Sequence, residues 1–215
     1  SFGAIDPTDY LIDTGIELSI PLDEGNLFSK VWKVEIIGET GHCVPVYFLD
    51  TYHPENSESH QRLGARLYGG DDYVRIRQEY LLGIGGVRLL KLLKKEISGL
   101  HLNEGHCTFA LLEMLKNGWS REKLAKKTLF TTHTPVPAGH DRFEWSDVKL
   151  LLGDLLPDDA ENLVIQAGDP ENGGRCSMSH LAVALSGTVN AVSNLNAWVA
   201  SSMFGEHHIH PITNG

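Results

Sequence analysis

The pattern of apolar and polar residues changes several times between the period of a strand and that of a helix. Residues 31–37 alternate with period two, a turn follows at residues 38–41, and residues 44–49 are a compact apolar run. This pattern predicts a hairpin or a pair of adjacent strands. From Tyr73 to about Leu93 the apolar side chains recur every three or four positions, which predicts one long helix.

Strands and helices continue to alternate along the rest of the chain. Short strands are predicted at residues 100–103, 128–132, 189–193 and 209–213, and helices near residues 109–117, 146–156, 178–187 and 197–204. This alternation is typical of a mostly parallel sheet with helices on both faces, so the chain is expected to be a Rossmann-like α/β protein over residues 31–215. Residues 1–30 show only fragments of alternation and are expected to form a poorly defined N-terminal segment.

Composition and charge limit the classes of function. Acidic residues outnumber basic ones by 28 to 18, which gives a net charge of −10 and argues against binding duplex nucleic acid or an anionic membrane. No apolar run reaches the roughly 18 residues of a membrane-spanning helix, and the N-terminus does not resemble a signal peptide. Three widely spaced cysteines, Cys43, Cys107 and Cys176, do not suit a disulfide framework and favour a cytoplasmic location.

Two motifs suggest ligands that their context does not support. The glycines of residues 83–86 resemble a dinucleotide-binding loop, but Arg88 occupies the third glycine position and the segment falls within a predicted helix. Close helix packing is the favoured explanation for these glycines. The histidines of residues 207–210 could ligate a metal, but no partner residue has convincing spacing, and solvated histidines are favoured.

Two loops follow predicted strands and carry polar side chains suited to a ligand. Glu104 and His106 follow the strand at residues 100–103, and His133 opens the loop after the strand at residues 128–132. In open α/β sheets, ligands bind outside the carboxyl ends of the strands. Both loops are therefore expected to lie where a site would form.

The loop that begins at His133 is expected to be stiff. Pro135 and Pro137 restrict φ, and Gly139 permits a sharp bend. Such rigidity suits a polar group that is held in place before a ligand arrives. A neutral imidazole can both donate and accept a hydrogen bond, as a sugar hydroxyl requires. The alternative is a histidine that only ties backbone segments together.

Asp71 and Asp72 offer paired carboxylates of the kind that act on glycosides. Adjacent residues rarely face the same site, however, and Asp72 is well placed to be the N-cap of the long helix. One of the two is therefore expected to cap the helix, and the role of the other stays open.

Taken together, several blocks of the sequence resemble the α-glucan phosphorylases, the family of glycogen, starch and maltodextrin phosphorylases. The blocks are residues 65–71, 75–88, 101–106, 130–143, 178–182, 190–193 and 212–215. They occur in the order of the family and cover roughly residues 44–215, whereas residues 1–30 match poorly.

The resemblance implies the N-terminal domain of a GT-B glycosyltransferase, with the active site in a cleft between two Rossmann-like domains. The family cleaves terminal α-1,4-linked glucose with phosphate and releases glucose 1-phosphate with retained configuration. A pyridoxal phosphate, bound to a lysine of the C-terminal domain, supplies its phosphate group as a proton relay. The implied partners are α-1,4-glucan, phosphate and the C-terminal domain or a second polypeptide, and a homo-oligomer is allowed.

By position in the motifs, His133 resembles the histidine that contacts the glucose 6-hydroxyl and whose carbonyl lies near the anomeric carbon. Asn214 resembles the asparagine that contacts the same hydroxyl, and Thr134 lies beside His133 in the substrate-binding block. Oriented dipoles of this kind would stabilise a transient oxocarbenium ion electrostatically.

The resemblance gives four further residues a place near the glucan. Asp71 and Asp72 fall on the mobile loop that gates the substrate channel of the family. Glu104 and His106 line the approach of the acceptor chain.

The sequence also departs from the family. A glycine-rich helix start that handles phosphate and the C-terminal domain with the cofactor lysine are absent, and Asn196 replaces a common histidine. The chain is expected to be a piece of a phosphorylase that does not turn over alone. Two alternatives stay open: a nucleotide-sugar GT-B glycosyltransferase of the glycogen or starch synthase kind, and a glucan-binding remnant without catalysis.

Overall fold

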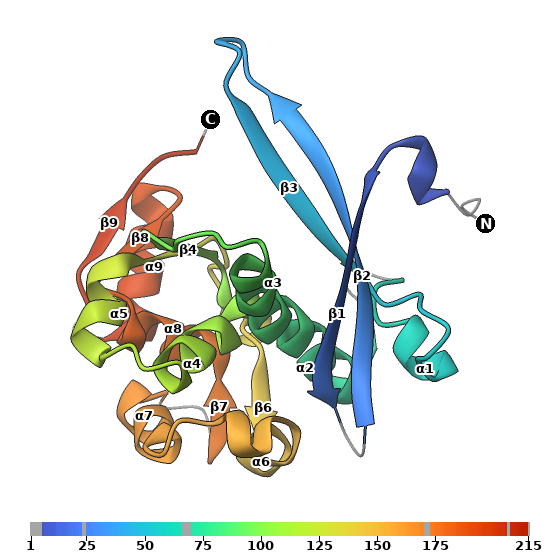
Figure 1. The fold of residues 1–215 in the computed structure, drawn as a ribbon. Coiled ribbons are helices and arrows are strands. Elements are labelled where there is room, and N and C mark those ends of the chain that lie inside the picture. The colour runs from blue at the N-terminus through green and yellow to red at the C-terminus, as the bar shows by residue number, and fades with distance from the viewer. Residues whose placement is uncertain (1–5, 23–24, 66–69, 170–172, 206, 215) are drawn as a thin grey trace. The chain divides into compact units, whose positions relative to one another are not determined.

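The computed structural model describes most of the chain in two compact units, Ser1–Leu81 and Leu82–Gly215 (Figure 1). The residues described are 6–22, 25–65, 70–169, 173–205 and 207–214. No helix in these ranges is long and apolar enough to cross a lipid bilayer.

The first unit contains a three-stranded antiparallel sheet. Its strands are β1 (Ile12–Leu22), β2 (Gly25–Ile37) and β3 (Cys43–Asp50), in the order β1-β2-β3. The hairpin expected from residues 31–49 is confirmed, because Val31 pairs with Leu49 and the two strands run antiparallel. The segment before residue 31, which the sequence pattern leaves undefined, supplies β1 and the start of β2. It adds Leu18, Ile20 and Leu22 to the core.

A short 3-10 turn and two helices complete the first unit. They are η1 (Pro7–Asp9), α1 (Glu58–Gln61) and α2 (Asp72–Tyr80). The residue that caps α2 is Asp71, whose carboxylate accepts a hydrogen bond from the Val74 N–H at 3.1 Å. The expectation that Asp72 is the cap is therefore wrong. A cap has extended backbone, as Asp71 has with φ −85° and ψ −179°, whereas Asp72 is already helical.

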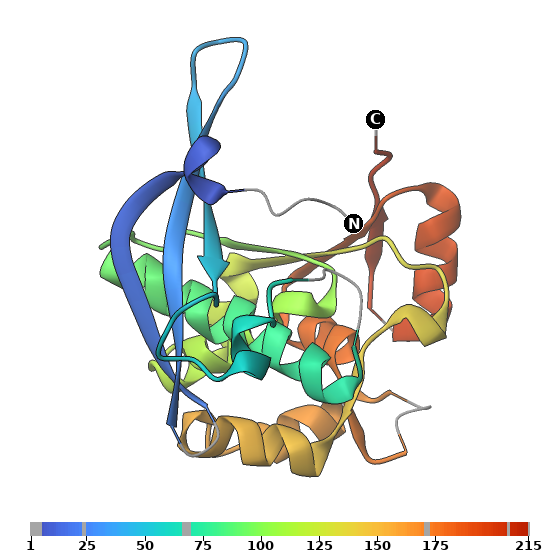
Figure 2. The same cartoon turned by 90° about the vertical axis from the view of Figure 1, so that its right-hand side faces the viewer.

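The second unit alternates strands and helices along most of its length (Figures 1 and 2). After η2 (Leu81–Gly85) its elements are α3 (Gly86–Leu92), β4 (Leu100–Asn103), η3 (Gly105–Cys107), α4 (Phe109–Lys116), α5 (Arg121–Lys127), β5 (Thr128–Thr132), η4 (Pro137–Gly139), β6 (Arg142–Glu144), α6 (Trp145–Leu152), η5 (Gly153–Leu155), α7 (Ala160–Ala167), β7 (Arg175–Ser177), α8 (Met178–Leu185), β8 (Thr188–Ala191), α9 (Asn194–Phe204) and β9 (Ile209–Pro211). The predicted strands and helices of this part are confirmed, with boundaries that differ by a few residues.

A parallel sheet in the order β4-β5-β8-β9 forms the centre of the second unit. The strands are short and contribute fully buried side chains such as Phe130 and Leu102 to the core. Helix α8 packs against β5, and α9 packs against β8 and β9. Because all four strands are parallel, their carboxyl ends lie along the same edge of the sheet.

The sequence pattern does not predict α7 or the antiparallel pair of β6 and β7. Both strands of that pair have only three residues, which is too short for a period-two pattern to be recognised. The pair matters for the site because β6 begins directly after the loop that carries His133.

The long helix expected from Tyr73 to about Leu93 is confirmed as an unbroken helical run, made of α2, η2 and α3 in succession. The middle segment, η2, is π-helical and contains Gly83. A Cβ at Gly83 would lie 2.7 Å from the backbone nitrogen of Ala110 in α4, so only a hydrogen fits there. Packing explains this glycine as expected, but a Cβ at Gly86 would meet nothing within 4 Å, so packing does not explain that one.

We therefore expect Gly83→Ala and Gly86→Ala to have opposite effects on the free energy of unfolding. Gly83→Ala forces a methyl group against backbone that cannot move aside easily, and it should destabilise the chain by about 2 kcal/mol. Gly86→Ala, as the matched control, should be neutral or stabilise helix α3 by about 0.5 kcal/mol. Urea unfolding of the two variants measures both effects, and equal values would contradict the packing explanation.

Candidate binding site at the carboxyl edge of the sheet

Four sequence segments meet at the carboxyl edge of the parallel sheet. Glu104 follows β4, and its N–H donates to the Thr131 carbonyl of β5 at 2.9 Å. His133 follows β5, and Asn214 lies just beyond β9, where its N–H donates to the Val192 carbonyl at 3.1 Å. The fold therefore brings Glu104, His133 and Asn214 to one edge, where open α/β sheets bind ligands.

The carboxylate of Glu104 holds the start of the His133 loop. Its Oε1 accepts a short hydrogen bond from the His133 N–H, a second from the Thr134 N–H at 2.8 Å and a third from the Thr134 hydroxyl at 3.0 Å. The Glu104 side chain is buried, whereas His133 is exposed. A buried, charged acceptor with three donors is a strong anchor, because hydrogen bonds to ionised groups exceed neutral ones in strength.

The backbone of Glu104 adopts a conformation that is almost restricted to glycine. Its φ is +64° and its ψ is −176°. A non-glycine residue in this region costs on the order of 1–3 kcal/mol and persists where the surrounding structure holds it there. The hydrogen bonds to the loop supply that restraint, so the chain stores strain at the end of β4 to place this carboxylate.

Two more side chains fix the middle of the loop. The His140 ring is buried and donates from Nε2 to the Thr134 carbonyl at 3.2 Å. Arg142 donates from one terminal nitrogen to the Pro137 carbonyl at 2.7 Å, and from Nε to the buried Asp169 carboxylate at 2.6 Å. The stiffness expected from the prolines is thus reinforced by side chains from outside the loop.

Gly139 provides the bend that the sequence indicates. A Cβ at this position would lie 2.5 Å from the Thr134 methyl group, so the loop closes on itself here. The φ of Gly139 is not in the left-handed region, so close approach is the reason for glycine at this position.

His140 and His180 are both buried and both neutral. Each donates from Nε2 to a carbonyl, Thr134 for His140 and Met203 for His180, and each Nδ1 faces a serine hydroxyl. Because a carbonyl can only accept, Nε2 carries the proton in both rings and Nδ1 accepts from the serine. Desolvation by burial lowers the pKa of both histidines, and it outweighs the acidic neighbours that would raise it.

A polar chain that the sequence pattern does not reveal crosses three strands near this edge. The Thr131 hydroxyl donates to Asn190 Oδ1 at 2.5 Å and lies 2.7 Å from His101 Nε2, which therefore donates to it. Thr131 and Asn190 are buried, so each polar group needs such a partner. The signal available in the sequence is weak, because polar residues inside short strands are common.

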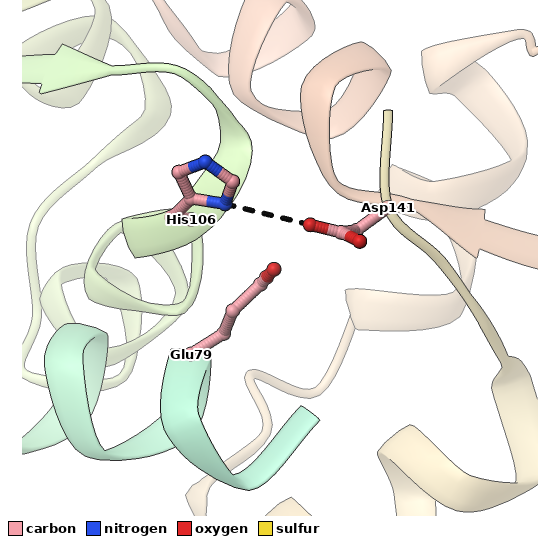
Figure 3. A group of neighbouring side chains, drawn as sticks. All are labelled: Glu79, His106 and Asp141. Carbon is pink, nitrogen blue, oxygen red and sulfur yellow. Dashed lines mark ion pairs between the residues drawn. The ribbon is translucent and has the colours of Figure 1, made fainter. Parts of the chain in front are cut away.

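His106 lies close to Asp141, which follows the His133 loop. Nδ1 of His106 is 3.4 Å from a carboxylate oxygen of Asp141, and Figure 3 shows the ring and the carboxylate facing each other. Both side chains are partly exposed. This pairing joins the turn after β4 to the segment before β6.

The remaining predicted residues have distinct places. Asp71 and Asp72 lie in the first unit, at the start of α2. In the part of the chain that the structure describes, none of His207, His208 and His210 belongs to a cluster of three or more metal-ligating side chains. Solvated histidines therefore remain the favoured interpretation of that segment.

No lysine of this chain has the surroundings that a covalently bound pyridoxal phosphate requires. All lysines fall within the described ranges, and each is exposed or half-buried. A lysine that forms a Schiff base is usually desolvated. The residues present therefore do not fit the covalent attachment of this cofactor.

A search of solved structures finds the same fold in a glycosyltransferase. The catalytic domain of starch synthase IV from Arabidopsis thaliana, bound to ADP and acarbose, superposes with a TM-score of 0.68 and 18% identity, over 95% of this chain and 41% of that one. The chain thus has the fold of a Rossmann-like GT-B domain: the sequence pattern predicts the α/β architecture, and the family resemblance implies the GT-B type. No family model matches the chain.

Sequence relatives narrow the class to one family. Maltodextrin phosphorylase from Thermococcus litoralis is 34% identical over 197 residues, and glycogen phosphorylase from Mycobacterium tuberculosis is 33% identical over 208 residues. Glycogen phosphorylase from Aquifex aeolicus is 31% identical over 88% of this chain. The chain is thus similar to internal portions of α-glucan phosphorylases, the family that its motifs resemble. It spans 23% of the length of the first two relatives.

Proposed function

We propose that the complete protein is an α-glucan phosphorylase and that this chain is part of its glucan-side domain. The reaction is phosphorolysis of a terminal α-1,4-linked glucose to glucose 1-phosphate, with retention. Support comes from the names of the relatives, glycogen and maltodextrin phosphorylase, and above all from the exposed His133 held on a clamped loop at the sheet edge.

In this proposal His133 binds the sugar. Its imidazole is exposed, while the backbone on either side is fixed by buried groups, so the ring can meet a hydroxyl without first being ordered. Asn214, exposed at the same edge, is the second group for that hydroxyl. Thr134 contributes to the site through the position of its backbone, because its hydroxyl is bonded to Glu104.

The other residues have roles in the approach of the glucan. Asp71, the N-cap of α2, and Asp72, its first residue, are assigned to the segment that gates the substrate channel, and His106, paired with Asp141, is assigned to the path of the acceptor chain. Glu104 has a role other than lining the approach of the acceptor chain, because its Oε1 already accepts three hydrogen bonds from the protein. We therefore assign Glu104 to positioning the loop.

The cofactor and the remaining partners are proposed for the complete enzyme. Pyridoxal phosphate is held by a lysine outside this chain and supplies a phosphate group for proton transfer. Inorganic phosphate and the domain that binds it complete the site, and the chain alone is not expected to turn over. The cytoplasmic location stays a prediction.

The alternative is a GT-B glycosyltransferase that uses a nucleotide sugar. Its support is the fold of starch synthase IV, whose structure is bound to ADP, but at 18% identity that likeness concerns the fold alone. The two functions differ in the donor. The full-length protein incubated with maltodextrin and phosphate should release glucose 1-phosphate, and ADP-glucose or UDP-glucose should not extend the glucan. Extension of the glucan by ADP-glucose or UDP-glucose, without release of glucose 1-phosphate, would show that the protein is instead a nucleotide-sugar glycosyltransferase.

His133→Ala should lower the activity of the full-length enzyme by about tenfold or more, because one sugar hydroxyl loses its partner. The free energy of unfolding should change by less than about 0.5 kcal/mol, since the side chain is exposed. His207→Ala, another exposed histidine, is the matched control and should keep full activity. An unchanged rate in His133→Ala would show that His133 does not bind the sugar.

A further inference from the structure

Asn196, in the first turn of α9, reaches across to the His133 loop. Its Nδ2 donates to the His133 carbonyl at 3.1 Å, and the side chain is buried, with 6% of its surface exposed. The backbone of Asn196 is itself held, because its N–H donates to the Ser193 hydroxyl that caps the helix. The amide is therefore presented from a fixed position.

Together with Glu104, Asn196 satisfies both polar backbone groups of His133. Glu104, at the end of β4, accepts from the N–H, and Asn196, after β8, donates to the carbonyl. The two side chains come from the segments that follow β4 and β8, the strands on either side of β5. The backbone of His133 is thereby held from both sides at the point where its imidazole enters solvent.

The amide of Asn196 makes this bond at a cost. A carbonyl accepts only, so the group that faces His133 is the NH₂, and Oδ1 points elsewhere. Oδ1 is buried and has no hydrogen-bond partner among the described residues. An unsatisfied buried oxygen is destabilising. A buried residue that lowers the stability of the chain while it holds the backbone of an exposed histidine is typical of a functional site rather than of a position that serves packing.

We infer that Asn196 is a positioning residue that fixes the His133 carbonyl and, through it, the direction of the imidazole toward the sugar. This inference rests on the proposed function, in which His133 contacts the glucose. Electrostatic stabilisation of a reacting sugar requires that the dipoles facing it be oriented beforehand. A carbonyl held by Asn196 needs no reorientation when the substrate arrives.

The test compares three variants of Asn196 in the full-length enzyme. Asn196→Leu removes the donor with little change in size, Asn196→Asp replaces the donor by a carboxylate that repels the carbonyl, and Asn196→His restores an N–H donor. The first two should lower kcat by about tenfold or more, with a smaller change in KM for glucan. Asn196→His should recover most of kcat. Asn194→Leu, an exposed asparagine of the same helix, is the control and should leave kcat unchanged.

Two further readouts separate positioning from a structural role. Asn196→Leu should keep or raise the melting temperature, because the orphaned oxygen is gone. In the labelled chain, the ¹³C signal of the His133 carbonyl should move upfield in the Leu and Asp variants and return in Asn196→His.

An Asn196→Leu enzyme with normal kcat, or an unchanged carbonyl signal, would overturn the inference. If the wild-type enzyme shows no phosphorolysis, the proposed function fails. The carbonyl signal then still decides whether Asn196 holds the loop.

Discussion

Glu104→Gly is expected to lower the rate of phosphorolysis by the full-length enzyme at least a hundredfold, while it changes the stability of the fold far less than Glu104→Ala does. Both substitutions remove the carboxylate that anchors the N–H groups of His133 and Thr134. They differ at the backbone, because glycine adopts φ +64° and ψ −176° freely and alanine does not.

The magnitudes follow from two opposing contributions. Loss of a buried anionic acceptor leaves the loop donors to find other partners and should cost about 3 kcal/mol in either variant. Relief of the backbone strain should offset about 1–3 kcal/mol of this loss of stability, and only in Glu104→Gly. Activity should fall by at least a hundredfold in both variants, because His133 no longer has a fixed position. Substrate binding must then order the loop, which costs conformational entropy.

Urea unfolding of the chain and the rate of glucose 1-phosphate release by the full-length enzyme measure these effects. Glu122→Ala, an exposed carboxylate in the first turn of α5, is the control and should leave both quantities unchanged within error. Equal stability of Glu104→Gly and Glu104→Ala would show that no strain is stored there. Normal activity in Glu104→Gly would show that the clamp has no part in catalysis.

The sequence predicts the strands of the parallel sheet and the edge where a site forms, because both follow from short-range patterns. Phe130 lies in a short, mostly buried strand whose threonines favour β structure, and the loop of His133 follows at once. The rule that ligands bind at the carboxyl ends of parallel strands then places Glu104 and His133 at the site without knowledge of any contact, whereas Asn214 is indicated only by the family resemblance.

What the sequence does not predict depends on backbone geometry or on distant partners. Nothing in the residues around Glu104 indicates a glycine-like backbone or a carboxylate turned toward a loop 29 residues away. Asn196 attracts notice only as a departure from the family motif, and its bond to the His133 carbonyl spans 63 residues. Contacts of this length are set by the tertiary fold and leave no local pattern.

Two smaller differences have local causes. Asp71 and Asp72 are both good capping residues, and only the backbone conformation distinguishes the cap from the first helical position. In β1, Gly15 and Pro21 interrupt the alternation, and the register shifts between Asp13 and Glu17. The strand is therefore longer than its pattern indicates.

The stability of the chain should fall steeply as the pH is lowered below about 6.5, the ordinary pKa of histidine. Burial lowers the pKa of His140 and His180, so the unfolded chain takes up two protons in a range where the native chain does not. Stability contributed in this way is complete above pH 6.5 and is lost as the pH falls toward the native pKa values. Two such groups give a slope of up to about 2.7 kcal/mol per pH unit.

The charged groups around the two rings do not reverse this direction. Glu104 and Asp141 raise the pKa of His140 and Arg142 lowers it, while Asp169 raises the pKa of His180, and Arg142 and His140 lower it. Desolvation is the largest cause for both. Both rings also contact the edge of Phe204, with centroids 5.6 Å and 5.0 Å away, which adds apolar surroundings.

Unfolding measured between pH 5 and 7 tests this before most carboxylates titrate. His140→Gln should remove about half of the slope and His207→Gln, at an exposed position, should remove none. A flat profile above pH 5, or the same slope in His140→Gln, would contradict the burial of neutral imidazoles. His140 Nε2 also holds the Thr134 carbonyl, so the buried imidazole that contributes to this pH dependence also supports the loop that carries His133.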